Sequence, residues 1–100
     1  MMDQGFLDTE FKYLVDIAAS GFSMAADDFN IKLKRGNVVK VFQKDDLVRD
    51  GDDFYLCFDS AEFGKGAITA IITAYVPDSD FEDGFRTEVY KLELVNVLGV

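Results

Sequence analysis

This chain of 100 residues contains no histidine, no tryptophan, one cysteine and one proline. Without histidine, a Ser-His-Asp triad, an imidazole zinc site and the usual pH switch near neutrality are excluded. Cys57 has no second cysteine to pair with, so an internal disulfide is excluded as well. Because Cys57 lies in the apolar run Phe54–Phe58, we expect an inert thiol in the core rather than a nucleophile.

Long hydrophobic runs are also missing. No apolar stretch approaches the roughly 20 residues that a membrane helix requires, and the amino terminus lacks the basic region and apolar run of a signal peptide. The net charge is −9, from 19 acidic and 10 basic residues. Such a chain is repelled by nucleic-acid backbones and anionic membranes. We therefore expect a protein that is cytoplasmic at synthesis, with neither nucleic acid nor membrane as a partner.

What the chain has is apolar residues: 49% of it is hydrophobic and ten residues are phenylalanine. This is enough for one core in a chain of this length. Residues 1–10 are acidic and show no apolar periodicity, so we expect a flexible leader there and a single domain over residues 11–100.

The clearest local pattern is a hairpin. Apolar and polar residues alternate strictly over Phe29–Lys34, which predicts a strand with one buried face. Arg35-Gly36-Asn37 then favours a tight turn, because glycine and asparagine tolerate positive φ. Residues 38–43 are the predicted return strand. A weaker alternation over Phe11–Ile17 predicts another half-buried strand.

Three further strands follow from the pattern. Phe54–Phe58 is apolar throughout, which predicts a short strand covered on both faces, and Ile68–Val76 suits a pleated surface. Thr87–Val97 is the last predicted strand, with Tyr90, Leu92 and Leu94 facing inward and Lys91 and Glu93 facing outward. About seven strands with frequent turn signals favour two packed antiparallel sheets, and a small barrel is the alternative.

The acidic segment Asp78–Gly84 is the main candidate site. Its glycine and glutamate positions do not fit a helical calcium loop. Two interpretations stay open: a non-helical calcium site built from Asp78, Asp80 and Asp83, or a solvated turn whose charge Arg86 neutralises in part. We expect no other cofactor.

Nothing in the sequence favours catalysis. Carboxylate pairs such as Asp52/Asp53 lie in polar segments where no pKa is raised by burial. Gly64-Lys65-Gly66 lacks the spacing of a phosphate loop and precedes a strand. A sugar-binding platform would need exposed aromatics, whereas the four tyrosines lie in strand patterns where packing explains them.

The charges are unevenly distributed. Lys32, Lys34 and Lys40 fall in a stretch without acids, while seven acids lie between Asp45 and Glu62. One interpretation is solvated strand faces and turns. The other is complementary contact between copies or with a protein partner, in which Lys32, Lys34, Lys40 and Arg86 are the interaction residues.

Three segments, Asp27–Gly36, Phe54–Asp59 and Val76–Glu88, resemble small immunoglobulin-like domains of tailed-phage and prophage virion proteins. The likeness is to the amino-terminal sandwich of baseplate upper proteins: a strand opening on a basic-residue-glycine turn, then an expanded acidic segment. The resemblance implies an immunoglobulin-like antiparallel β-sandwich and a non-enzymatic structural or interaction domain in a tail, baseplate or head fibre. It also implies localisation in a virion and protein partners or self-assembly. The alternative is a ligand-binding module of the same fold, for carbohydrate or calcium.

Overall fold

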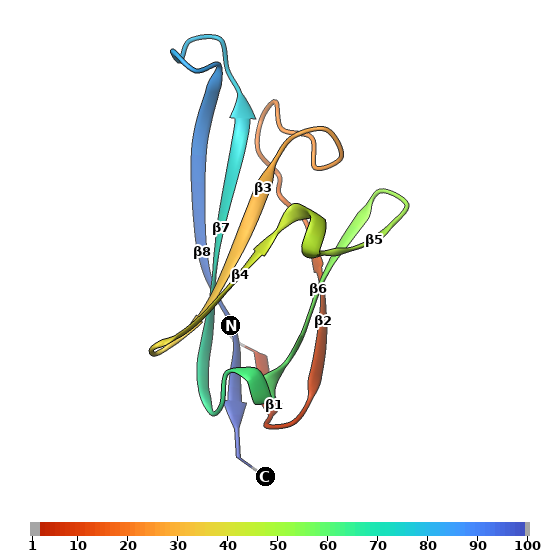
Figure 1. Cartoon of the computed structure of the whole chain (residues 1–100), viewed down its shortest axis with the longest axis vertical. Helices are drawn as coiled ribbons and strands as arrows, with labels where there is room; N and C mark the ends of the chain where they lie inside the picture. Colours follow the sequence, from red (N-terminus) through yellow and green to blue (C-terminus); the bar gives the residue numbers. More distant parts are fainter. Residues whose placement is uncertain (1–2, 100) are drawn as a thin grey trace.

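The computed structural model describes residues 3–99, which form eight strands and two short 3-10 helices (Figure 1). In chain order the elements are β1 (Asp3–Phe6), β2 (Glu10–Val15), β3 (Phe29–Arg35), β4 (Val38–Gln43), η1 (Lys44–Asp46), β5 (Val48–Asp50), β6 (Asp53–Asp59), η2 (Ser60–Glu62), β7 (Gly66–Pro77) and β8 (Phe85–Leu98). One sheet has five strands in the order β1-β8-β7-β3-β4, and the other has three in the order β2-β6-β5. The sheets face each other as a sandwich, which confirms the all-β class and not the barrel.

The strand order identifies the type of sandwich. Neighbouring strands are antiparallel except β1 and β8, which run parallel. Immunoglobulin sandwiches place strands G, F, C and C′ in one sheet and B, E and D in the other. Strands β8, β7, β3 and β4 take the first order, and β2, β6 and β5 take the second. The fold is therefore immunoglobulin-like, with eight strands rather than about seven.

The core lies between the sheets and is built from alternate residues of each strand. On β3, Phe29, Ile31 and Leu33 are almost completely buried, and the Phe29 ring meets Phe54 of β6 edge-on at 5.6 Å. Each such burial contributes about 1.5–3 kcal/mol. The predicted hairpin is confirmed, since β3 and β4 pair around a turn in which Gly36 has a φ of 53°.

The prediction of a flexible leader is wrong for the described part of residues 1–10. β1 pairs with β8 from Asp3 opposite Val95 to Phe6 opposite Leu98. The side chain of Ser60, fully buried, ties this segment down: its Oγ donates to the Phe6 carbonyl at 3.0 Å and accepts from the Thr9 amide at 2.9 Å. These contacts join residues about 50 positions apart, so local periodicity does not reveal them.

The prediction of a core thiol is also wrong. β6 is a strand as predicted, but Phe54, Leu56 and Phe58 are buried while Cys57 is exposed. β6 is the middle strand of a sheet whose second face meets solvent, so only alternate residues enter the core. The unbroken apolar sequence of β6 therefore does not indicate a strand that is buried on both faces.

β8 changes face partway along its length. Val95 and Val97 are buried, Tyr90 and Leu94 are half-buried, and Leu92 is 43% exposed. Ile68 lies opposite Val95 but Thr69 lies opposite Glu93, which leaves Leu94 as the extra residue of a β-bulge. The bulge exchanges the inward and outward positions. The predicted inward set therefore does not continue through the strand.

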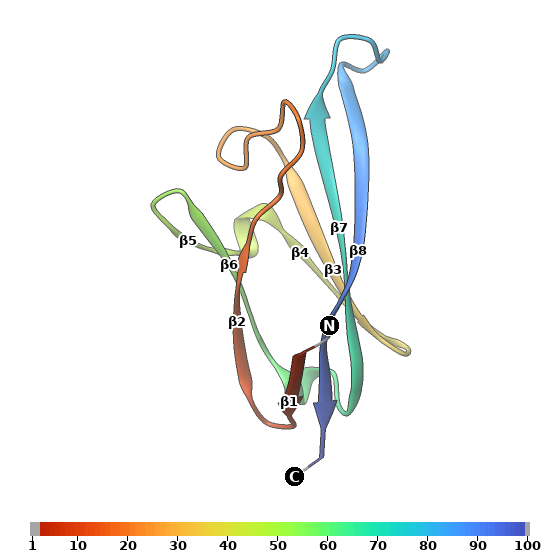
Figure 2. The same cartoon turned by 180° about the vertical axis from the view of Figure 1, so that it is seen from behind.

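The molecule is elongated, with extents of 50 × 29 × 22 Å. The β7–β8 hairpin extends past β2 and β6 at the upper end (Figures 1 and 2). Only the segment between β2 and β3 accompanies it there. At the lower end, β1 lies beside β8 and connects to β2 (Figure 2). The inner face of upper β8 is consequently less covered than the rest of the sandwich.

Candidate functional site

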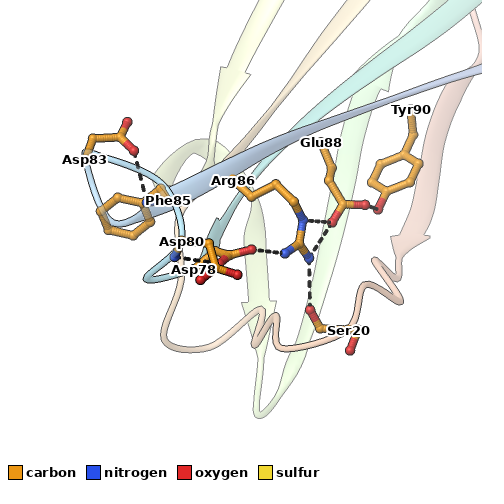
Figure 3. Close-up of polar contacts among 8 residues, drawn as sticks. All are labelled: Ser20, Asp78, Asp80, Asp83, Phe85, Arg86, Glu88 and Tyr90. Carbon is orange, nitrogen blue, oxygen red and sulfur yellow. Dashed lines mark hydrogen bonds and ion pairs between the residues drawn. The ribbon is translucent and has the colours of Figure 1, made fainter.

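The acidic loop at the tip of the β7–β8 hairpin is closed by its own backbone. The Asp78 amide donates to the Gly84 carbonyl at 2.9 Å, and the Gly84 amide donates to the Phe81 carbonyl at 2.9 Å. Gly84 has a φ of 83°, a conformation that side chains other than glycine rarely adopt. Two aspartates cap the turn: Asp78 Oδ1 accepts from the Asp80 amide at 3.0 Å, and Asp83 Oδ1 accepts from Phe85 at 3.1 Å (Figure 3).

The side chains of Asp78, Asp80 and Asp83, which one of the two open interpretations assigns to a calcium site, are not gathered around a common point in this structure. One oxygen of Asp78 caps the Asp80 amide and the other is bound by Arg86, and Asp83 caps its own side of the loop. Within residues 3–99, no group of three or more acidic or cysteine side chains could hold a metal ion. The physical reason is that the carboxylates of Asp78 and Asp83 bind backbone amides of the turn, where they complete its hydrogen bonds.

Arg86 is the centre of the polar contacts in Figure 3. Its Nη1 lies 2.5 Å from Asp78 Oδ2, its Nη2 lies 2.9 Å from Glu88 Oε2, and its Nε donates to the same Glu88 oxygen at 3.0 Å. Nη2 also donates to the carbonyl of Ser20 at 3.3 Å. Arg86 thus neutralises part of the charge of the acidic turn, at Asp78, as the solvated-turn interpretation has it. We call Asp78, Arg86, Glu88 and Tyr90 the arginine cluster.

Strand geometry places the cluster. Arg86, Glu88 and Tyr90 are alternate residues on the inner face of β8, and Arg86 pairs with the fully buried Val76. Because the three-stranded sheet does not reach this far, the segment carrying Ser20 packs there instead (Figures 1 and 3). The cluster therefore fastens that segment to the hairpin.

The cluster shifts the proton affinities of its own members. The pKa of Asp78 is lowered, first by the Asp80 amide and then by the Arg86 guanidinium. The Tyr90 hydroxyl, which donates to Glu88 Oε1 at 2.7 Å, and then Arg86 lower the pKa of Glu88. The same hydrogen bond raises the pKa of Tyr90, because Tyr90 must remain protonated to donate. These shifts stabilise fixed charges and prepare no proton donor or acceptor for pH 7.

The structure separates the predicted interaction residues. Lys32 and Lys34 lie on the outer face of the five-stranded sheet, while Lys40 lies on the other face and forms an ion pair with Glu62 at 2.9 Å. Arg86 is engaged within the arginine cluster. Lys40 and Arg86 thus have partners inside the chain, and neither lies beside Lys32 and Lys34.

A third lysine joins Lys32 and Lys34 on the outer face. One cross-strand row runs from Val41 through Lys32 and Ile71 to Lys91. Lys34 and Lys91 flank an open hollow of about 420 Å³ whose lining contains no acid. Glu93 lies on the same face, in the cross-strand row that runs from Val39 through Lys34 and Thr69. The three lysines, Glu93 and the neighbouring Val39, Val41, Ile71 and Val89 are called the lysine face below; its lysines outnumber its one acid by three to one. The sequence predicts Lys91 on the outward side of its strand, but its place beside β3 depends on the β3–β7–β8 register, which strand periodicity does not give.

A second hollow lies at the upper end of the outer face. It has a volume of about 340 Å³ and is lined by Asp28, Tyr75, Asp83, Phe85 and Thr87. Tyr75 and Thr87 are directly paired across β7 and β8, and Phe85 is 46% exposed. The strand pattern predicts a packing role for Tyr75, whereas in the structure Tyr75 is half-buried beside this hollow.

Comparison with known proteins adds no relative: no family model, curated protein or solved structure matches this chain. In residues 3–99, no helix has the length and apolar character needed to cross a membrane.

Proposed function

We propose that this chain is a non-enzymatic interaction domain, and that its lysine face binds the acidic turns of another copy. The observation that carries the proposal is the location of three lysines on one face of a chain whose net charge is −9. Acids are abundant elsewhere: Asp45, Asp46, Asp50, Asp52 and Asp53 lie in and around η1 and the β5–β6 turn. A face and a turn of opposite charge on one chain favour head-to-tail contact.

The apolar residues of the lysine face matter as much as its charges. Val39, Val41 and Val89 are 47%, 51% and 61% exposed. Surface ion pairs contribute only about 0–1 kcal/mol each, so lysines alone would not hold two copies together. Burial of apolar surface contributes about 25 cal/mol of binding free energy per Å². The charges then determine which surface binds and in which orientation.

Head-to-tail contacts repeat from copy to copy and produce rings or filaments. We propose that such an assembly belongs to a phage or prophage virion, as a tail, baseplate or head-fibre component. The support for this placement is the resemblance of Asp27–Gly36, Phe54–Asp59 and Val76–Glu88 to virion domains, together with the immunoglobulin-like fold.

Light scattering at two ionic strengths tests the head-to-tail contact. We expect an average mass above the monomer at about 0.01 M salt and a decrease at about 1 M, where the Debye length falls from about 30 Å to about 3 Å. Lys32→Glu/Lys34→Glu should lower the average mass at low salt, because it reverses two of the three lysine charges of the face. Lys40→Glu/Lys65→Glu makes the same charge change away from the lysine face and should retain the association. Association that is indifferent to salt, or equal loss in both double variants, would contradict the proposal.

A specific observation favours a second candidate, a carbohydrate-binding module. The hollow beside Tyr75 and Phe85 combines aromatic surface with the carboxylates of Asp28 and Asp83 and the hydroxyl of Thr87. Sugars bind through such stacking surfaces and hydrogen-bonding groups. Calorimetry with a panel of neutral oligosaccharides should then show binding that Phe85→Ala weakens at least tenfold and Phe81→Ala, in the exposed loop, leaves unchanged. Absence of heat across the panel would exclude this candidate for those sugars.

A further inference from the structure

One edge of the three-stranded sheet is open. β2 pairs with β6 on one side, and no strand within residues 3–99 pairs with its other side. Thr9 shows which residues bond toward β6, because its carbonyl accepts from the Ser60 amide at 2.9 Å. Because backbone groups alternate sides along a strand, the amides and carbonyls of Glu10, Lys12 and Leu14 point toward the open side.

The open edge borders an apolar groove. Leu14, next to last in β2, is 58% exposed on the outer face of the three-stranded sheet, and Leu92 of β8 is 43% exposed. Leu92, with Ile72 and Leu94, lines a hollow of about 150 Å³ between the five-stranded sheet and the residues Tyr13 to Asp16 at the open edge. Within residues 3–99, the pairing of β1 with β8 begins at Val95, three positions beyond Leu92. Unpaired strand edges next to exposed apolar side chains readily pair with another chain.

We propose that β2 of a second copy occupies this edge, antiparallel to the first, around a two-fold axis at Leu14. This inference deepens the proposed interaction function by naming a second, symmetric contact. Charge complementarity indicates the occupant. Glu10, Lys12, Leu14 and Asp16 are the exposed, alternate residues of this segment. With Leu14 opposite Leu14 of the second copy, Lys12 lies opposite Asp16 of that copy, and the two-fold axis makes the pair twice.

The neighbouring symmetric registers in one direction are disfavoured by like charges, and the first slip in the other direction sets Leu14 opposite Asp16, so that the opposite charges no longer meet. A two-residue slip in one direction sets Glu10 opposite Asp16 of the second copy, and a further slip sets Lys12 opposite Lys12. Like charges directly opposite each other are destabilising in a sheet, whereas opposite charges contribute about 0.2–1 kcal/mol per pair. The register centred on Leu14 therefore combines an apolar centre with matched charges on either side.

The geometry of this register is specific. Leu14 and its copy form a hydrogen-bonded pair that exchanges both backbone bonds, with Cα atoms about 5.5 Å apart. The two three-stranded sheets become one continuous six-stranded sheet. Leu14 is then covered by its copy, and the two grooves lined by Leu92 adjoin each other across the axis.

Disulfide trapping tests the register in a Cys57→Ser background, which removes the native exposed thiol. A Cα separation of about 5.5 Å suits a disulfide, so Leu14→Cys should form a covalent dimer on mild oxidation. Lys12→Cys should not, because its copy lies four residues further along the partner strand, about 13 Å away. Val48→Cys is the matched control, since Val48 is 49% exposed in β5 at the other edge of the same sheet.

Three results would overturn the edge dimer: Leu14→Cys that cross-links no faster than Val48→Cys, Lys12→Cys that cross-links faster than Leu14→Cys, or a wild-type edge filled by a different protein. Exchanging the charges of Lys12 and Asp16 gives a second, independent test of the edge dimer. Lys12→Asp should shift the protein toward monomer in light scattering, and Lys12→Asp/Asp16→Lys should restore the dimer. Circular dichroism verifies that each variant is folded.

The outcomes separate the two proposals. If Leu14→Cys fails to cross-link while Lys32→Glu/Lys34→Glu still lowers the average mass at low salt, only the edge dimer is wrong. If Leu14→Cys cross-links while Lys32→Glu/Lys34→Glu leaves the association unchanged, the edge dimer stands and the head-to-tail contact is wrong.

Discussion

At the scale of single residues, Ser60 has the widest structural consequence. Its side chain is fully buried and satisfies two backbone groups from the β1–β2 connection, the Phe6 carbonyl and the Thr9 amide. The Ser60 amide in turn donates to the Thr9 carbonyl. One hydroxyl thereby joins the amino-terminal strand of one sheet to the end of β6 in the other. A small polar residue that looked like part of a connection is a structural link between the sheets.

Ser60→Ala should destabilise the fold by about 1–3 kcal/mol, because a buried amide and a buried carbonyl lose their partner. For a domain of this size, each kcal/mol lowers the melting temperature by about 4–8 °C. Thermal melting measures the loss, and hydrogen exchange should accelerate most at Leu7 and Thr9. Ser79→Ala, in the exposed hairpin loop, is the control. Equal melting temperatures for the two variants would show that the Ser60 hydroxyl is not needed.

At the scale of elements, the sequence predicts strands well where one face is buried and the other solvated. Phe29–Lys34 alternates strictly and forms β3, and its hairpin partner and turn were predictable for the same reason. The all-β sandwich follows from several such strands. Among site residues, the contact between Arg86 and the acidic turn was also predictable, because Arg86 lies only eight positions from Asp78.

Non-local contacts explain what could not be predicted. β1 exists because it pairs with β8 at the far end of the chain. The bulge at Leu94 is defined only against β7, so the side-chain directions of β8 could not be extrapolated from Tyr90. For the same reason, Lys91 joins Lys32 only through Ile71, and Lys40 falls on the opposite face. Periodicity reports the two faces of a strand but not its neighbours.

At the scale of the whole molecule, the distribution of charge sets how stability responds to pH. The acidic total of −9 disfavours the compact state by self-repulsion, which weakens as carboxylates protonate. The arginine cluster acts in the opposite direction. Asp78 and Glu88 have lowered pKa values in the folded state, so their contribution is present above their ordinary values near 4. It is lost as the pH falls through the lowered values. The raised pKa of Tyr90 contributes below about pH 10 and is lost as the pH rises through it.

Glu88→Gln should therefore flatten the stability profile at both ends. On the acidic side it removes one carboxylate whose ionised form Arg86 and Tyr90 favour. On the alkaline side it replaces a charged acceptor by a neutral amide oxygen, which holds the Tyr90 proton less strongly. Tyr90→Phe should abolish the alkaline decrease that this hydroxyl causes and leave the contact between Arg86 and Asp78 in place. Melting temperatures measured from acidic to alkaline pH at constant ionic strength give both the acidic and the alkaline decrease in stability.

Asp52→Asn, in the β5–β6 turn, is the control, because it makes the same charge change as Glu88→Gln away from the cluster. It separates the general effect of lower net charge on stability from the local effect of the cluster. If Glu88→Gln and Asp52→Asn gave superimposable profiles, the arginine cluster would not contribute to the pH dependence, and self-repulsion alone would account for it.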